Sequence, residues 1–138
     1  MREDFDWLSI KIGINDIHRQ LGDPANFSVR SYAEDYRAIL DEAVKKKPKL
    51  ILIDPFYIST DRSGTFRTRV LDLLADYLKV VESLAKEYNA LHVKTQKMFE
   101  QALKTHRADE FCPEPVHPYR AGHLAIALEL YKVLGGKL

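Results

Sequence analysis

The chain has 138 residues, 46% of them apolar, and its 21 basic and 20 acidic side chains leave a formal net charge of +1. This length predicts a single globular domain over residues 1–138. The even charge balance, without a basic stripe, excludes an electrostatic attraction for nucleic acid. No apolar run reaches the ~18 residues that span a bilayer. Because the first residues lack the features of a signal peptide, we expect a cytoplasmic protein.

Strand-like and helix-like segments alternate along the chain, which is typical of an α/β domain with a mostly parallel sheet. We predict strands at Trp7 to Ile12, Leu50 to Ile53 and Leu91 to Val93. The second strand is apolar at every position, as expected of a parallel strand covered by helices on both faces. In the first strand Ser9 and Lys11 alternate with apolar residues, so we expect one of its faces to be poorly covered.

Four helices are expected between and after these strands. Ser31 and Glu34 have the spacing of a capping box, which predicts that the first helix begins at Ser31. Three further helices are expected near residues 66–88, 96–105 and 119–134. The second of the four carries an apolar stripe that we predict to be core: Phe66, Val70, Leu73, Tyr77, Val81 and Leu84.

Polar segments follow the first two strands, and a third segment precedes the last helix. Gly13-Ile14-Asn15-Asp16 comes after the first strand, Asp54-Pro55-Phe56-Tyr57 comes after the second, and His117 lies just before the final helix. Ligands of open α/β sheets bind beyond the carboxyl ends of the strands, so we expect the three segments to share one rim. Alone, Asn15-Asp16 is a common turn dipeptide, and a single His is more often a surface residue than a base.

Two stretches, Gly13 to Asp16 and Glu114 to His123, resemble sequence blocks of the SGNH (GDSL-type) hydrolases, which are esterases. One block of that family supplies an oxyanion-hole Asn within Gly-X-Asn-Asp. Another supplies a catalytic His within Asp-X-X-His, usually followed by Pro and then by Gly-His. The resemblance implies a three-layer α/β/α, flavodoxin-like fold with a parallel sheet. It also implies a Ser-His-acid mechanism that passes through an acyl-enzyme and uses no cofactor or metal.

The resemblance implies a role for five residues of this chain. Asn15 would donate a hydrogen bond to the oxyanion. His117 would be the general base, oriented by Glu114, which occupies the position where the family has Asp. Gly13 would allow close approach of the backbone, and Tyr57 would line the pocket for the acyl or alcohol part. The expected ligand is a small-molecule ester.

The family's nucleophile block, Gly-Asp-Ser, does not occur in this sequence. None of the serines stands in a comparable context: Ser9, Ser28, Ser31, Ser59, Ser63 and Ser83. We therefore expect a family member that lacks its first two strands and their helices. Three interpretations stay open: an ester hydrolase, a non-catalytic truncated relative that acts as a binding or self-assembling module, and a reading frame that starts late in an ordinary esterase. The exposed sheet edge near Trp7 predicts self-association.

Overall fold

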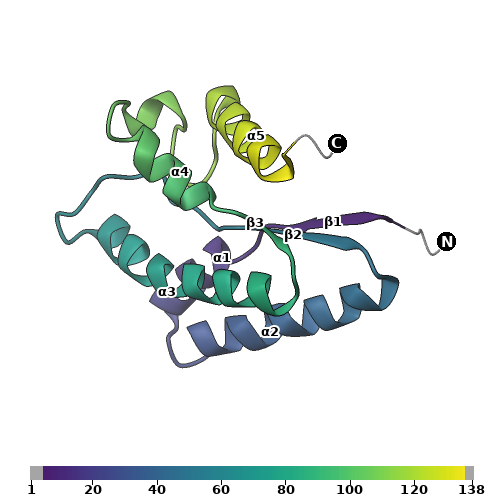
Figure 1. The fold of residues 1–138 in the computed structure, drawn as a ribbon. Coiled ribbons are helices and arrows are strands. Elements are labelled where there is room, and N and C mark those ends of the chain that lie inside the picture. The colour runs from purple at the N-terminus through teal and green to yellow at the C-terminus, as the bar shows by residue number, and fades with distance from the viewer. Residues whose placement is uncertain (1–4, 136–138) are drawn as a thin grey trace.

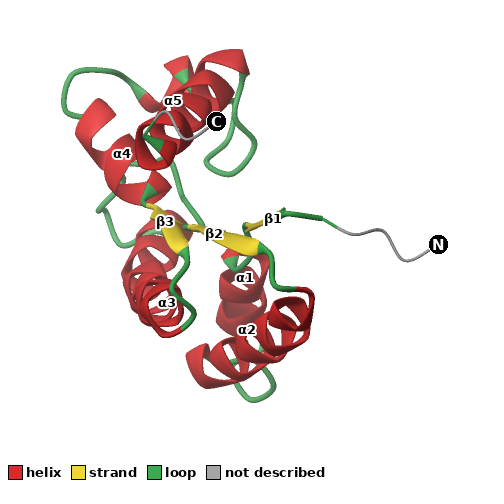
Figure 2. Cartoon of the chain, turned by 45° about the vertical axis from the view of Figure 1, so that its right-hand side comes forward, coloured by secondary structure: helices red, strands yellow, loops and turns green. Residues whose placement is uncertain are grey.

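Helices cover both faces of a three-stranded sheet in the computed structural model, which describes residues 5–135 (Figures 1 and 2). The elements are β1 (Trp7–Ile10), α1 (Ile14–Gly22), α2 (Val29–Ala43), β2 (Lys49–Ile53), α3 (Phe66–Glu87), β3 (Leu91–Val93), α4 (Thr95–Ala102) and α5 (Arg120–Leu134), with short 3-10 turns at Val44–Lys46 and Ala108–Glu110. All strands are parallel, in the order β1-β2-β3. Helices α1, α2 and α3 lie on one face, and α4 and α5 lie on the other (Figure 2). The predicted three-layer fold is confirmed.

The central strand β2 joins the two layers of the core. Leu50 and Leu52 belong to the apolar cluster formed with α1, α2 and α3. Ile51 and Ile53 belong to a second cluster, to which α5 contributes Leu134. The strand is therefore covered on both faces, as its continuous apolar sequence predicts.

The edge strand β1 is well covered on one face, whereas on the other face Trp7 packs against the cluster that contains Leu134 and Ser9 is left open. Leu8 and Ile10 pack against the cluster beneath the sheet, whereas Ser9 is exposed on the other face, as the alternation predicts. Lys11 follows the strand, and its Nζ lies 4.5 Å from the centre of the Phe56 ring. Among residues 5–135, no strand pairs with the outer side of β1.

The residue that caps α2 is Ser28, three residues before the predicted Ser31. The Ser28 hydroxyl accepts a hydrogen bond from the Ser31 backbone N–H at 3.0 Å, and the Ser31 hydroxyl accepts one from the Ser28 N–H at 3.0 Å. Ser31 is therefore the third helical residue of a capping box, and Ser28 is the cap. The prediction chose the wrong serine because Glu34 offered an alternative partner at the same spacing.

Four of the six residues in the predicted apolar stripe of α3 are buried, while Leu73 is half-buried and Phe66 is exposed. Val70, Tyr77, Val81 and Leu84 are at most 1% exposed, whereas Phe66 is 47% exposed. Phe66 was wrongly placed in the core. It is the first residue of the helix, where the chain has only begun to approach the sheet.

A carboxylate precedes α3 and receives several hydrogen bonds. Asp61 accepts from the Ser63 backbone N–H at 2.9 Å, from the Ser63 hydroxyl at 2.5 Å and from the Thr65 hydroxyl at 2.6 Å. These hydrogen bonds favour the ionised form and lower the pKa of Asp61 to about 2. The turn that leads into α3 therefore depends on the ionisation of this carboxyl.

We predict that Asp61→Asn lowers the urea midpoint of unfolding at pH 6. The pKa of Asp61 is lower in the folded chain than its ordinary value of 3.8, so its contribution to stability is present above that value and lost as the pH falls toward 2. The difference between variant and wild type should shrink across this window. Asp76→Asn, at an exposed ion pair with Lys79, should change little at any pH. A difference for Asp61→Asn that is independent of pH would contradict the prediction.

Candidate active site

The loop after β2 is tied to the neighbouring elements by three hydrogen bonds. The Asp54 N–H donates to the carbonyl of Val93 at 3.0 Å, and the Thr95 hydroxyl donates to the Asp54 carbonyl at 2.8 Å. The Tyr57 N–H donates to Oε1 of Gln96 at 2.8 Å. Thr95 and Gln96 are buried in the first turn of α4, so the loop is fixed to β3 and α4 together.

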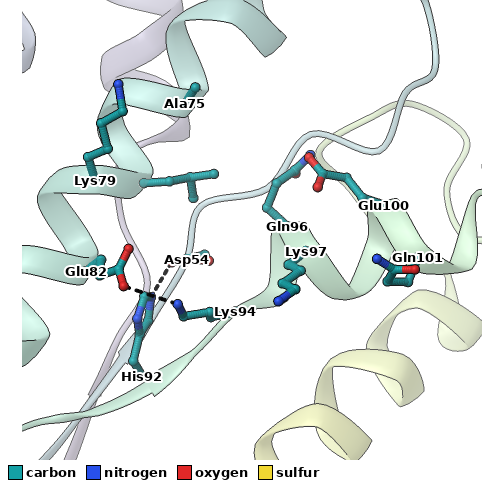
Figure 3. A pocket seen from close by; sticks show the side chains of 11 residues that line it. Asp54, Ala75, Lys79, Glu82, His92, Lys94, Gln96, Lys97, Glu100 and Gln101 are labelled. Atoms are coloured by element: carbon teal, nitrogen blue, oxygen red, sulfur yellow. Dashed lines mark hydrogen bonds and ion pairs between the residues drawn. The ribbon is translucent and has the colours of Figure 1, made fainter.

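A buried Asp–His pair strengthens this attachment (Figure 3). Nε2 of His92 lies 2.6 Å from Oδ1 of Asp54, and the side chains are 14% and 5% exposed. Burial raises the pKa of the Asp54 carboxyl, while the hydrogen bond and charge of His92 oppose that rise. The pair borders a pocket of 330 Å³ that is also lined by Lys79, Glu82, Lys94 and Lys97.

Sequence reasoning missed the Asp54–His92 pair because their relation depends on strand register. Leu52 is the partner of His92 in the parallel ladder, and Asp54 lies two residues further along. The signal was present, since each residue occurs in or directly after a predicted strand. Only the pairing of those strands brings the carboxyl to the imidazole.

Gly13 makes the sharp connection between β1 and α1. Its φ is 123°, a conformation that side-chain-bearing residues rarely adopt. A Cβ atom there would lie 2.9 Å from the Tyr32 hydroxyl and 3.2 Å from Cγ of Pro55. Gly13 thus allows the start of α1 to lie against the loop after β2.

Two tyrosines of α2 fix the end of β1 beneath this connection. The Tyr36 hydroxyl donates to the Ile10 carbonyl at 3.4 Å, and the Tyr32 hydroxyl donates to the Ile12 carbonyl at 3.3 Å. Burial raises the pKa of both phenols well above the ordinary value, so both remain neutral donors at physiological pH. The sequence analysis did not foresee these two hydrogen bonds.

Asn15 lies in the first turn of α1, shortly after the end of β1. The helix starts at once because the Ile17 N–H donates to the Gly13 carbonyl at 3.0 Å. Asn15 is exposed, whereas Ile17 on the buried side is 0% exposed. The Asn15 amide is therefore carried by a helix terminus at the carboxyl end of the sheet.

His117 and Glu114 form a hydrogen-bonded pair on the loop before α5. Nδ1 of His117 is bonded to Oε1 of Glu114, and the side chains are 75% and 57% exposed. The Ile58 N–H donates to the Pro115 carbonyl at 2.9 Å, which ties this loop to the loop after β2. Val116, which lies between Glu114 and His117 in the sequence, packs against the main apolar cluster.

Tyr57 lies beside this pair but is buried. Only 5% of Tyr57 is exposed, and its ring is packed edge-on against His18 at 6.2 Å between centres. Burial raises the pKa of Tyr57; the charge of Arg67 lowers it and that of Glu114 raises it. The predicted pocket-lining role of Tyr57 stays a prediction, because its side chain belongs to the core cluster.

The loop after β2 therefore connects the predicted site segments. It contacts Gly13 through Pro55 and the His117 loop through Ile58. Among the described residues, no three His, Cys, Asp or Glu side chains are grouped to hold a metal ion. None of the helices within residues 5–135 is long and apolar enough to cross a membrane.

Comparison with known proteins places this arrangement in one class, the SGNH hydrolases. The family model described as GDSL-like Lipase/Acylhydrolase matches residues 2–125. The chain belongs to this family. The structure also resembles a protein of Parabacteroides merdae described as a GDSL-like lipase, with a TM-score of 0.84 and 27% identity over 94% of this chain and 60% of that one.

A curated relative is the acetylxylan esterase of Geobacillus stearothermophilus, 37% identical over 134 residues. The alignment covers 94% of this chain and 59% of the relative, so the chain spans about three fifths of that enzyme's length. A solved structure of an acetylxylan esterase from the same organism has a TM-score of 0.81 and 32% identity, and the match covers 96% of this chain and 60% of that one. Two further structures of that esterase are described as catalytic mutants, with a serine or an aspartate changed to alanine.

Gly122 allows the His117 loop to pack against α5. A Cβ atom at Gly122 would lie 2.6 Å from Cβ of Pro118 and 2.8 Å from the carbonyl oxygen of Phe111. We predict that Gly122→Ala lowers the free energy of unfolding in urea by about 2 kcal/mol, because the loop must shift. Gly22→Ala is the matched control: its Cβ would meet nothing within 4 Å, so stability should be equal or higher. Equal stability of the two variants would contradict the prediction.

Proposed function

We propose that this chain is the part of a carboxylic ester hydrolase that supplies the oxyanion donor and the general base. The observation that carries the proposal is the Glu114–His117 pair, whose loop is tied to the loop after β2. That second loop contacts Gly13, next to the start of α1 where Asn15 lies. Family membership supports ester hydrolysis as the chemistry of this rim.

Each proposed role follows from the chemistry of the side chain. With Nδ1 of His117 held by Glu114, Nε2 is the nitrogen that would take a proton from a nucleophile. The Asn15 amide would donate a hydrogen bond to the oxyanion that develops as the ester carbonyl is attacked. Glu114 would replace the aspartate of the family, since its longer side chain still reaches the imidazole.

The proposed substrates are acetyl esters of sugars. This assignment rests on the acetylxylan esterase relative. The acyl-enzyme mechanism also requires a nucleophilic serine, and the Gly-Asp-Ser block that supplies it in the family does not occur in this sequence. We therefore expect acetate release by this chain alone to be slow, because oxyanion stabilisation and binding without the nucleophile give only weak catalysis.

If this chain releases acetate from partly acetylated xylobiose, Asn15→Ala and His117→Ala should each reduce the rate by about a hundredfold. His106→Ala is the control, since His106 lies beyond the carboxyl end of α4 and bonds Thr105 there. Unchanged rates in the first two variants would remove both residues from the mechanism.

Intact-mass spectrometry after treatment with a fluorophosphonate, which labels activated serines, tests whether one of the serines of this chain acts as the nucleophile. One stoichiometric adduct on a serine would identify a recruited nucleophile and support hydrolysis by this chain. An unmodified mass together with undetectable acetate release would mean that this polypeptide alone is not a serine esterase.

A second candidate function is that of a non-catalytic module that binds or self-assembles. The exposed edge of β1 near Trp7 favours it, because the outer side of the strand has no partner strand among the described residues. Helix α5 adds three large exposed apolar side chains at helical spacing: Leu124 at 61%, Leu128 at 52% and Tyr131 at 59% exposed. A second copy of the chain would cover part of this apolar surface.

Self-association through β1 predicts a concentration-dependent sedimentation coefficient in the micromolar range. Ser9→Lys should shift the equilibrium toward the monomer, because it places a second charge beside Lys11 on the exposed face of the edge strand. Gln101→Lys adds the same charge on α4 and should leave the equilibrium unchanged. A strictly monomeric wild type at high micromolar concentration would exclude this interface.

A further inference from the structure

One buried nitrogen near the candidate site has no hydrogen-bond partner. Nε2 of His18 is inaccessible to solvent, and it is the only such side-chain atom among residues 5–135. Leaving a buried polar group unpaired costs about 1–3 kcal/mol. A ligand that hydrogen-bonds to this nitrogen would explain why it has no partner within the protein.

The position of His18 places this nitrogen close to the proposed chemistry. His18 lies on α1, three residues after Asn15, so the two side chains project from neighbouring positions on the helix surface. Its ring centre lies 6.2 Å from that of Tyr57 and 5.7 Å from that of Phe66. Tyr57 belongs to the loop after β2, whose Ile58 N–H is bonded to the Pro115 carbonyl, so His18 contacts a loop that is tied to the segment carrying His117.

We propose that His18 is a specificity-determining residue that binds a hydroxyl group of the sugar part of the ester through Nε2. This inference rests on the proposed function and extends it to the alcohol side of the substrate. Phe66 would provide the apolar surface against which the sugar ring packs. Phe66 is 47% exposed at the start of α3, so the outward movement that this binding would require should cost little packing.

The chemistry of the imidazole selects a hydroxyl over the acetyl group. In a neutral imidazole, Nε2 is either a donor or an acceptor, depending on the tautomer. A hydroxyl group both donates and accepts, and therefore satisfies either form. The acetyl group has a carbonyl oxygen that accepts but no donor, and therefore satisfies only the tautomer in which Nε2 carries the proton. A hydroxylated ring between His18 and Phe66 is consequently the ligand that removes the energetic cost of the unpaired nitrogen.

Nuclear magnetic resonance of the chain with labelled histidines tests the inference directly. The sequence contains five histidines, so the imidazole signals can be assigned individually. Partly acetylated xylobiose should shift the signals of both His18 and His117 in a saturable manner. Ethyl acetate, an ester without a hydroxylated ring, should shift His117 alone. His92, paired with Asp54, serves as an internal reference in both titrations.

Two substitutions separate recognition from packing. His18→Phe keeps a ring and removes the nitrogen, so it should weaken binding of acetylated xylobiose by about tenfold and leave the thermal midpoint equal or higher. His18→Gln keeps a donor and an acceptor and should bind within about threefold of wild type. A residue that is only structural would show a lower thermal midpoint in His18→Phe and no selective loss of sugar binding.

The outcomes distinguish this inference from the function on which it rests. A response of His117 without one of His18, or unchanged binding in His18→Phe, would overturn the role of His18 and leave the ester site intact. The absence of any response at His117 to either ester would overturn the proposed function and the inference together.

Discussion

The attachment of the loop after β2 is the constraint on which the candidate site depends. Asp54 fixes the start of that loop to His92 and α4, while its far end at Ile58 is bonded to the loop that carries His117. Between these points Pro55 lies against Gly13. A single short segment thus sets the relative position of two chain regions that are about one hundred residues apart in the sequence. The segment is held by hydrogen bonds in which the buried residues Asp54, Thr95 and Gln96 take part.

Much of the fold could be predicted from the sequence because its signals are local. The continuous apolar run of β2 and the alternation in β1 indicate how each strand is covered, and both indications hold. Parallel strands end at one edge, so the polar segments after them were expected to meet there, and the contact of Gly13 with Pro55 agrees. The family resemblance was legible for the same reason, since each of its blocks is a short contiguous run of residues.

Features that depend on contacts between distant residues were not predicted. The unforeseen helix α1 buries a single residue completely, Ile17, so its apolar stripe is too thin to recognise. The capping serine of α2 was misassigned because Ser28 and Ser31 both have suitable partners. In each case the sequence offered several local solutions, and tertiary packing selected among them.

The parallel sheet has a consequence for how this chain folds. Trp7 pairs with Lys49 and Ile51 pairs with Leu91, so each ladder joins residues about forty positions apart. Closing such loops costs chain entropy before any strand contact compensates it, which makes the sheet slow to form compared with the helices. Until the sheet has formed, the apolar side chains on both faces of β2 stay exposed to solvent. Newly made chains are therefore most prone to aggregate before β2 is enclosed, and a low synthesis temperature should favour soluble protein.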